Sequence, residues 1–248
     1  IVTLNFGVSF VSGQDVSSEI FKRIPVTLSM NIISLVIVFI LSLYLGIKSA
    51  LNYEKKSDYI IRQLALVSFS MPSFYLALIF IIIFALKLDW FPISGLHSVE
   101  EKEGFANFLD MAWHLTLPIA VMVFVGFGSM IIYIRSLTLE ILKSDYYYFA
   151  LSRGVSQTQL LRLYILPNLL PPIITLLGLS LPGLIGGSVI LESLFGIEGM
   201  GQLFFMSALS RDYPIIMGTL MITAFLTLFG NMLADLILLK LNPYMQRG

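Results

Sequence analysis

The chain has 248 residues, of which 57% are hydrophobic and 12% are charged, and its mean hydropathy is +0.90. A soluble globular domain carries about a quarter charged residues, so this composition excludes an ordinary soluble core and predicts a chain surrounded by lipid. The 15 basic and 15 acidic residues balance, so the net charge gives no indication for or against nucleic acid. We expect no nucleic-acid partner for a chain of this class. The absence of cysteine excludes disulfides and thiolate metal sites.

Five apolar segments are each long enough to cross a bilayer, which requires about 20 residues. They cover residues 26–50, 60–88, 115–137, 169–191 and 214–239. Lipid cannot hydrogen-bond the backbone, so we interpret all five as helices, and their lack of alternation argues against a β-barrel. Pro72, Pro118 and Pro182 are expected to kink their spans. The prediction is an all-α, polytopic membrane protein.

Glycines are concentrated in the fourth span, where Gly183 and Gly187 are four residues apart. Two small residues at this spacing allow neighbouring helices to approach closely. The pattern therefore predicts helix packing, and a glycine face that lines a pore is the alternative.

The distribution of Lys and Arg predicts which loops face the cytoplasm. One set of loops holds ten basic residues and the other holds five. The first set is 48–62, 135–168 and 240–248, and the second is 1–25, 87–114 and 192–213. We therefore expect an extracytoplasmic segment at 1–25 before a transmembrane domain at 26–248. No signal peptide is visible, so this orientation requires an odd number of upstream spans, and we expect one, giving six.

The cytoplasmic loop at 138–168 is too long for a simple connection. Its pattern predicts two short helices, at 146–151 and 157–164, separated by Gly154. Pro167 is expected to stop the second helix or to start the next one. Such a loop either docks on a partner protein or lies on the membrane surface as an amphipathic segment, and the physical pattern leaves both open.

The same loop resembles the "EAA" loop of ABC importer permeases, in which Glu-Ala-Ala precedes a glycine and a later Leu-Pro. The matching residues are Ala150, Gly154, Tyr164 and Leu166-Pro167. Tyr148 and Phe149 replace the Glu and the first Ala, as in the branch that carries oligopeptides, dipeptides and nickel. Further stretches that resemble this branch are 6–10, 23–28, 183–201, 211–214, Asp235 and 241–243.

This resemblance implies the type I permease fold of ABC importers, located as a multi-pass protein in the cytoplasmic (inner) membrane. The chain has no G-x-x-x-x-G-K-[ST] motif, so we expect no enzymatic activity and no cofactor on it, with ATP and Mg²⁺ on a separate ATPase. The implied partners are a second permease in a heterodimer, two cytoplasmic ATPase subunits, an extracytoplasmic substrate-binding protein and the lipid bilayer. The implied cargo is an oligopeptide or dipeptide, or else nickel or a metal chelate.

In such permeases the two short helices of the loop dock in a cleft of the ATPase. The residues expected to form this coupling segment are Asp145, Tyr146, Ala150, Arg153, Gly154, Leu160, Tyr164 and Pro167. Among them, the resemblance assigns docking to Ala150, Gly154 and Leu160, with Arg153 pairing an acidic group of the ATPase.

Ionisable groups at membrane depth are functional candidates by default. The candidates for translocation or packing are Gly183, Gly187, Glu192, Asp212 and Asp235. For Glu192 we favour a structural anchor or a contact with the binding protein over a substrate ligand. For Asp235 we favour a bond to a neighbouring helix over a proton relay, which would belong to the rival function, an ion-coupled secondary transporter.

Two histidines, His97 and His114, lie in an outer loop that is rich in carboxylates. Their sixteen intervening residues give no metal-ligand spacing, so a solvated loop is preferred to a metal site.

Overall fold

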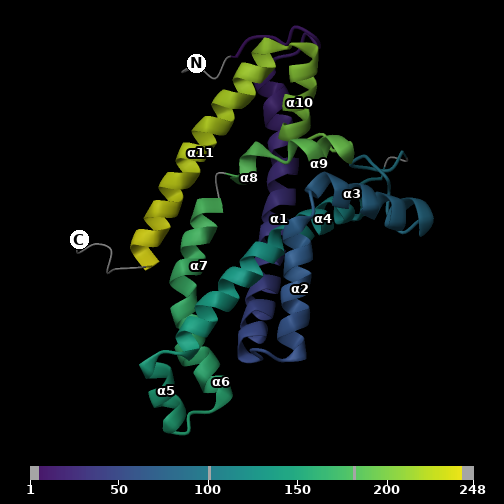
Figure 1. Cartoon of the computed structure of the whole chain (residues 1–248). Coiled ribbons are helices and arrows are strands. Elements are labelled where there is room, and N and C mark those ends of the chain that lie inside the picture. Colours follow the sequence, from purple (N-terminus) through teal and green to yellow (C-terminus); the bar gives the residue numbers. More distant parts are fainter. Residues whose placement is uncertain (1–5, 100–101, 181–182, 242–248) are drawn as a thin grey trace. The chain divides into compact units, whose positions relative to one another are not determined.

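The computed structural model describes residues 6–99, 102–180 and 183–241, without the side chains of residues 185, 186, 234, 235 and 237–241. This part of the chain is helical, with one isolated bridge between Val8 and Asp15. The elements are α1 (Val16–Leu51), α2 (Lys56–Ser70), α3 (Ser73–Phe80), η1 (Ile81–Lys87), α4 (Phe105–Leu142), α5 (Asp145–Ser152), α6 (Gln157–Leu160), η2 (Leu161–Ile165), α7 (Leu166–Ser180), α8 (Gly183–Gly186), α9 (Val189–Leu194), α10 (Met200–Ser210) and α11 (Tyr213–Leu241) (Figure 1).

Two compact units make up the chain. Unit 1 consists of residues 1–34, 72–122 and 181–231, and unit 2 consists of residues 35–71, 123–180 and 232–248. Boundaries fall inside α1, α4 and α11, so each of these long helices contributes one part to each unit.

Within the described residues, four helices are long and apolar enough to cross a bilayer. They are Val16–Leu51, Phe105–Leu142, Gln157–Ser180 and Tyr213–Leu233. The segment predicted as one span at 60–88 is instead two helices, and it adds a fifth span only if the broken pair is counted as one. Pro72 causes the break, because proline disfavours helical backbone in the residue before it, and Met71 is extended at φ −87° and ψ 126°.

The fourth predicted span, at 169–191, is also displaced. Its helix ends at Ser180, and the glycine-rich stretch after it forms only the short helices α8 and α9. Gly187 separates them with φ +68°, a left-handed conformation in which an α-helix cannot continue. Pro182 lies outside the described residues, whereas Pro118 is accommodated inside α4.

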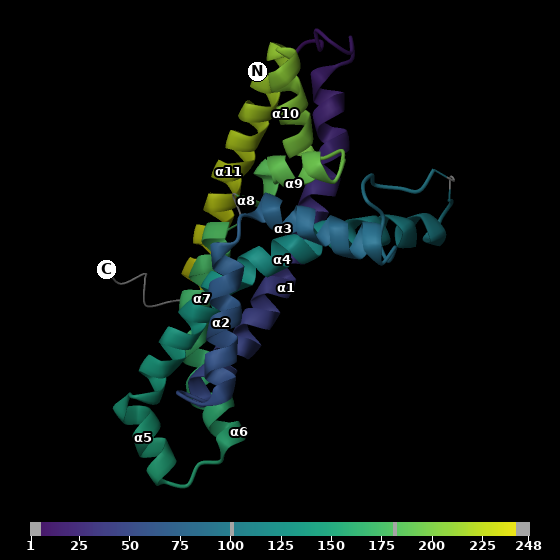
Figure 2. The ribbon, with the colours of Figure 1, turned by 45° about the vertical axis from the view of Figure 1, so that its right-hand side comes forward.

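Unit 2 has a core formed by α1, α4, α5, α6, η2 and α7. Its fully buried members include Ile134, Leu160, Ile165 and Leu169. A Cβ on Gly46 would lie 2.8 Å from the Cβ of Ile134, so the glycine lets α1 and α4 approach closely here. Both views place the α1–α2 turn and the α5–α6 pair at the same end of this unit (Figures 1 and 2). This is the arrangement expected if the basic loops share one side of the membrane.

Unit 1 has a smaller apolar core between the first turns of α1, α10 and α11. It is built from Val16, Ile20, Met200, Leu203, Ile215 and Ile222. Gly218 permits this packing, because a Cβ there would lie 2.7 Å from a methyl group of Val16.

Candidate functional site

The turn between α5 and α6 is defined by capping at both of its ends. Gly154 has φ +76°, its N–H donates to the carbonyl of Leu151 (3.0 Å), and the N–H of Val155 donates to that of Ala150 (3.3 Å). These two bonds form a Schellman motif, which ends a helix at a left-handed glycine. Ser156 then begins α6 through a capping box with Gln159. The glycine predicted from the sequence is therefore required by the backbone of the turn.

The inner face of this segment is buried in the core of unit 2. Tyr147, Ala150 and Leu160 all lie in that core, and burial raises the pKa of the Tyr147 phenol. Ala150 and Leu160 were expected to dock on a partner, but their side chains are enclosed by their own chain. They hold the two helices against each other instead of forming an external surface.

The outer face of the segment is apolar and exposed. The exposed side chains are Tyr146, Tyr148, Phe149, Leu151 and Leu163, and Phe149 and Leu163 are 61% and 63% exposed. Arg153 lies over the ring of Phe149, with its Cζ 4.6 Å from the ring centre. Asp145 lies in the first turn of α5, where its negative charge interacts favourably with the helix dipole. We call this exposed set the outer face of the coupling segment.

The second helix of the segment was predicted to be short, at 157–164, but it is long. The chain continues from α6 through the π-helical turn η2 into α7, so it forms one helical run over Gln157–Ser180. Tyr164 is half-buried in η2, and its carbonyl accepts a bond from the Asn168 side chain (2.6 Å). Pro167 is exposed and lies at the second position of α7. The helical run continues through it, so Pro167 does not stop the helix.

An ion pair that no sequence pattern predicted joins α2 to α4 in unit 2, with a buried carboxylate and a partly buried guanidinium. Arg135 of α4 donates from Nε and Nη2 to the two carboxylate oxygens of Asp58 in α2, at 2.7 and 2.8 Å. Ser49 Oγ (2.5 Å) and the N–H of Glu54 (3.0 Å) donate to the same carboxylate. The guanidinium lies over the Tyr53 ring, with the Arg135 Cζ 5.4 Å from the ring centre. The arrangement fixes the α1–α2 turn to α4.

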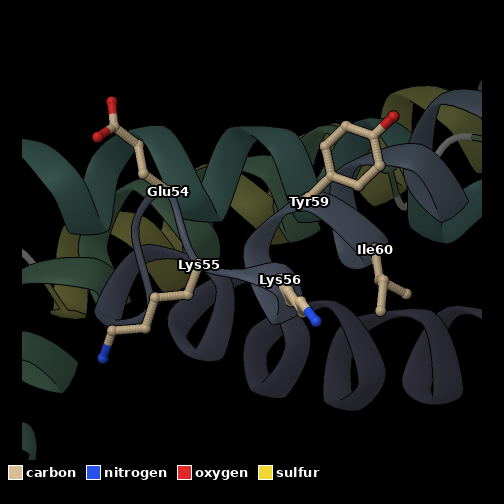
Figure 3. Close-up of a pocket in the computed structure, with 5 residues that line it drawn as sticks. All are labelled: Glu54, Lys55, Lys56, Tyr59 and Ile60. Atoms are coloured by element: carbon tan, nitrogen blue, oxygen red, sulfur yellow. The ribbon is translucent and has the colours of Figure 1, made fainter.

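The same turn carries a shallow pocket of about 470 Å³. Its lining residues are Glu54, Lys55, Lys56, Tyr59 and Ile60 (Figure 3). The close-up shows the two lysine side chains extending to one side of the turn and Glu54 to the other. The pocket is therefore a basic surface at the end of the unit.

Glu192 is fully buried in unit 1 and has no cationic partner among the described residues. Its carboxylate accepts bonds from Thr27 Oγ (3.1 Å) and from the N–H of Gln202 (3.0 Å). Gln202 lies in the first turn of α10, whose N-cap is Gly199 and so has no capping side chain. The carboxylate from α9 supplies the missing cap.

Close approach of this carboxylate depends on glycine. A Cβ on Gly199 would overlap the Glu192 carboxylate and lie 2.6 Å from Thr27 Oγ, and a Cβ on Gly187 would lie 2.6 Å from the same carboxylate. Gly183 and Gly187 do not form a packing stripe on one helix, because Gly183 begins α8 and Gly187 follows its end. A contact between Glu192 and a binding protein is also wrong, since the side chain is 0% exposed.

Asp212 fixes the N-terminal loop to the corner between α10 and α11. Ser9 Oγ donates to its carboxylate at 2.5 Å, and the N–H of Phe10 donates at 3.1 Å. Burial alone would raise the pKa of Asp212, but the bonds from Ser9 and from the backbone of Phe10, Val11 and Ile215 outweigh it and lower this pKa. Phe10 and Val11 remain exposed at the tip of the loop.

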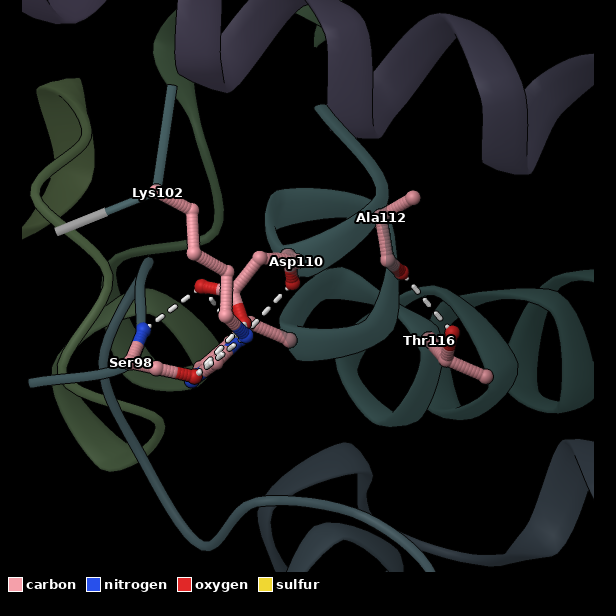
Figure 4. Close-up of polar contacts among 6 residues, drawn as sticks. Ser98, Lys102, Asp110, Ala112 and Thr116 are labelled. Carbon is pink, nitrogen blue, oxygen red and sulfur yellow. Dashed lines mark hydrogen bonds and ion pairs between the residues drawn. The ribbon is translucent and has the colours of Figure 1, made fainter. Parts of the chain in front are cut away.

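Asp110 and His114 form a buried polar cluster in unit 1, which corrects the expectation of a solvated loop around His114. Lys102 Nζ (2.6 Å) and the N–H and Oγ of Ser98 (2.6 and 2.5 Å) donate to Asp110 (Figure 4). His114 Nδ1 lies 2.8 Å from the Asp110 carbonyl. His97 is exposed and outside this cluster. Among the described residues, no cluster of three or more His, Cys, Asp or Glu side chains could hold a metal ion.

Asp235 lies in α11, but its side chain is outside the described part of the structure.

Comparison with known proteins identifies a family that covers most of this sequence. Residues 42–247 match the family described as binding-protein-dependent transport system inner membrane component. The oligopeptide transport system permease protein AppB of Bacillus subtilis is 35% identical over 240 residues, which cover 96% of this chain and 75% of AppB. The metal-staphylopine import system permease protein CntB of Staphylococcus aureus is 34% identical over 244 residues, covering 98% and 74%.

Solved structures share the fold at lower identity. The MetNI methionine ABC transporter, in an inward-facing conformation, superposes with a TM-score of 0.68 at 16% identity, covering 90% of this chain and 96% of that chain. An amino acid ABC transporter gives a TM-score of 0.63 at 14% identity, covering 90% and 94%. The predicted type I permease fold is therefore confirmed.

Proposed function

This chain belongs to the family of binding-protein-dependent transport system inner membrane components, and from that premise we propose that it is the permease subunit of a peptide importer in the cytoplasmic membrane. The family assignment confirms the predicted resemblance and decides against the ion-coupled secondary transporter. The chain is a multi-pass transport component and not an enzyme. ATP and Mg²⁺ are assigned to two partner ATPase subunits.

Peptide is the proposed cargo because AppB is named as an oligopeptide permease, and the 29% identical DppB of Pseudomonas aeruginosa as a di/tripeptide permease. A metal chelate is the second candidate cargo, because CntB is named as a permease of a metal-staphylopine import system. In either case an extracytoplasmic binding protein delivers the cargo, and a second, different permease completes the pore as a heterodimer.

The outer face of the coupling segment is the observation that carries this proposal. It exposes aromatic and aliphatic side chains on two helices that are capped on both sides of Gly154. A cluster of exposed large apolar groups at one end of a unit is suited to a protein partner. We assign this face to the ATPase, with Phe149 and Leu163 as the principal contacts and Arg153 held over Phe149.

Movement of the ATPase pair would then reach the membrane through a continuous helix. Leu163 belongs to the helical run that α6, η2 and α7 form, so a shift of the ATPase at Leu163 would be passed directly to the span over Gln157–Ser180. Such a device alternates between two rigid arrangements, and ATP binding on the partner favours one of them.

Substitution of Gly154 tests this coupling with a matched control. Gly154 and Gly104 both have positive φ (+76° and +58°) and nothing within 4 Å of a Cβ, so Gly154→Glu and Gly104→Glu impose the same kind of backbone strain. We expect Gly154→Glu to abolish uptake and co-purification of the ATPase, while Gly104→Glu retains both. Gly154→Asn should keep most activity, since Asn tolerates left-handed backbone. Normal uptake by Gly154→Glu would refute the assignment.

The cargo is tested separately, with the purified binding protein of the same system. Calorimetry with a mixture of short peptides and with a nickel chelate distinguishes the two candidates. Peptide binding supports the proposal, whereas binding of the chelate alone replaces peptide by metal and leaves the permease assignment intact.

A further inference from the structure

An apolar groove runs along unit 2 between the last turns of α1 and the start of α7. It has a volume of about 620 Å³. Its lining residues are Ile40, Leu43, Tyr44, Ile47, Lys48, Leu51, Asn52, Leu161 and Leu166. Six of these nine side chains are aliphatic, and none is acidic. The groove is therefore an apolar wall with a single cation.

The cation lies at one end of this wall. Lys48 is in the last turn of α1, and its Nζ lies 5.4 Å from the centre of the Tyr44 ring, which holds the ammonium beside the groove. Asn52 is one turn further along, and its side-chain amide donates one hydrogen to the Lys48 carbonyl (2.9 Å) while a second N–H is available. Two donors thus lie at the same end, beyond the aliphatic residues Ile40 and Leu43.

Polar donors at one end of the groove and aliphatic side chains along it match the headgroup and the acyl chain of a phospholipid in the bilayer. Lys48 belongs to the loops whose excess of Lys and Arg places them on the cytoplasmic side, where anionic headgroups attract basic residues. A phosphate at that level would meet the ammonium and the amide, and the acyl chain below it would contact only carbon. The neighbouring pair Lys55 and Lys56 adds positive charge at the same end of the unit (Figure 3).

A protein segment fits this surface less well than a lipid. An apolar helix that filled the groove would cover the Lys48 ammonium without a partner, and burying an unpaired charge is strongly unfavourable. We propose that the groove binds an anionic phospholipid, whose phosphate is held by Lys48 and Asn52 and whose acyl chain lies along Ile40, Leu43 and Ile47.

Lipid retention by the whole transporter tests this proposal. The complex with its partner subunits is purified in mild detergent, stripped of lipid, and titrated with phosphatidylglycerol or phosphatidylcholine while bound lipid is counted by native mass spectrometry. Wild type should prefer phosphatidylglycerol. Lys48→Gln should weaken that binding about fivefold, and Lys48→Arg should restore it.

Two controls make the outcome specific to the groove. Lys55→Gln removes the same charge from the neighbouring pocket, outside the groove, and should lower binding of phosphatidylglycerol less than Lys48→Gln does. An equal loss in the two variants would show that only general surface charge attracts the lipid, and would overturn the proposal. Ile40→Trp should lower binding of either lipid, because Ile40 is 63% exposed in the groove and the indole would occupy the acyl-chain position.

Residues 1–248 contain no cysteine, so Ile40→Cys adds the one labelling position in this part of the sequence. A photoreactive group attached there should cross-link to lipid in native membranes. Cross-linking to a polypeptide instead would show that another protein segment fills the groove, and the lipid site would be abandoned. Neither result alters the assignment of the ATPase contact, which is the outer face of the coupling segment.

Discussion

Asp58 and Glu192 are both buried carboxylates, and the two units of the chain stabilise them in different ways. In unit 2, Asp58 is paired with Arg135 through two hydrogen bonds, and Ser49 and the backbone of Glu54 occupy the remaining positions. In unit 1, Glu192 has no cation beside it among the described residues, and it accepts bonds from Thr27 and from the N-terminus of α10.

This difference shows what each solution requires of the surrounding sequence. An ion pair requires one particular side chain at one distant position, and losing it leaves a bare charge behind. A carboxylate that caps a helix requires close backbone, and therefore glycine at Gly187 and Gly199. The first site is vulnerable to loss of a side chain, and the second is vulnerable to gain of one.

The largest effect is expected from Arg135→Met, which leaves the Asp58 carboxylate buried without its partner. We expect the free energy of unfolding to fall by about 3–5 kcal/mol, measured by SDS titration in mixed micelles with circular dichroism. The double variant Asp58→Leu with Arg135→Met should lose less than Arg135→Met alone, because no charge remains. Additive losses in this double-mutant cycle would contradict the pairing.

A smaller loss, about 1–3 kcal/mol, is expected from Glu192→Ala, because the variant leaves no bare charge and removes only the acceptor of neutral donors, the Thr27 hydroxyl and the Gln202 N–H among them. Gly199→Ala should act on the same contact by displacing the carboxylate. The double variant Glu192→Ala with Gly199→Ala should therefore lose little more free energy of unfolding than the less stable of the two single variants. If the two losses add, the glycine has a role apart from Glu192, and the comparison with Asp58 fails.

The smallest effect concerns pH and the loop held by Asp212. Since its pKa is lowered in the folded state, the carboxylate contributes stability fully above the unfolded value of about 3.9, and that contribution is lost as the pH falls through the lower, folded value. Hydrogen exchange of residues 8–15, corrected for intrinsic rates, should stay slow at neutral pH and accelerate below about pH 4. Asp212→Asn should exchange rapidly throughout; the same pH profile in this variant would exclude Asp212 as the cause.

Local patterns account for what could be predicted. Apolar runs identified the helices, and Gly154 with its neighbours identified the turn between α5 and α6, because capping depends on residues within one turn of each other. The failures also have local causes: the straight span at 60–88 neglected the effect of Pro72 on Met71, and the span at 169–191 neglected the left-handed Gly187.

Contacts between distant residues could not be predicted in this way. Asp58 and Arg135 are 77 positions apart, and Thr27 and Glu192 are 165 apart, so no periodicity relates them. Ala150 and Leu160 were assigned to docking from the resemblance alone. Their burial follows from the folding of α5 against α6, which turns the small and apolar positions inward and leaves Phe149 and Leu163 outside.

The uninterrupted run from α6 to α7 makes this part of the chain a lever. Its 24 residues correspond to a rod roughly 36 Å long at 1.5 Å per residue. A tilt of about 10° at one end of a rod of that length displaces the other end by about 6 Å, close to one helical turn of 5.4 Å. Small rotations of the proposed ATPase partner at Leu163, which lies in this run, would therefore be amplified mechanically without any change in secondary structure along the helix.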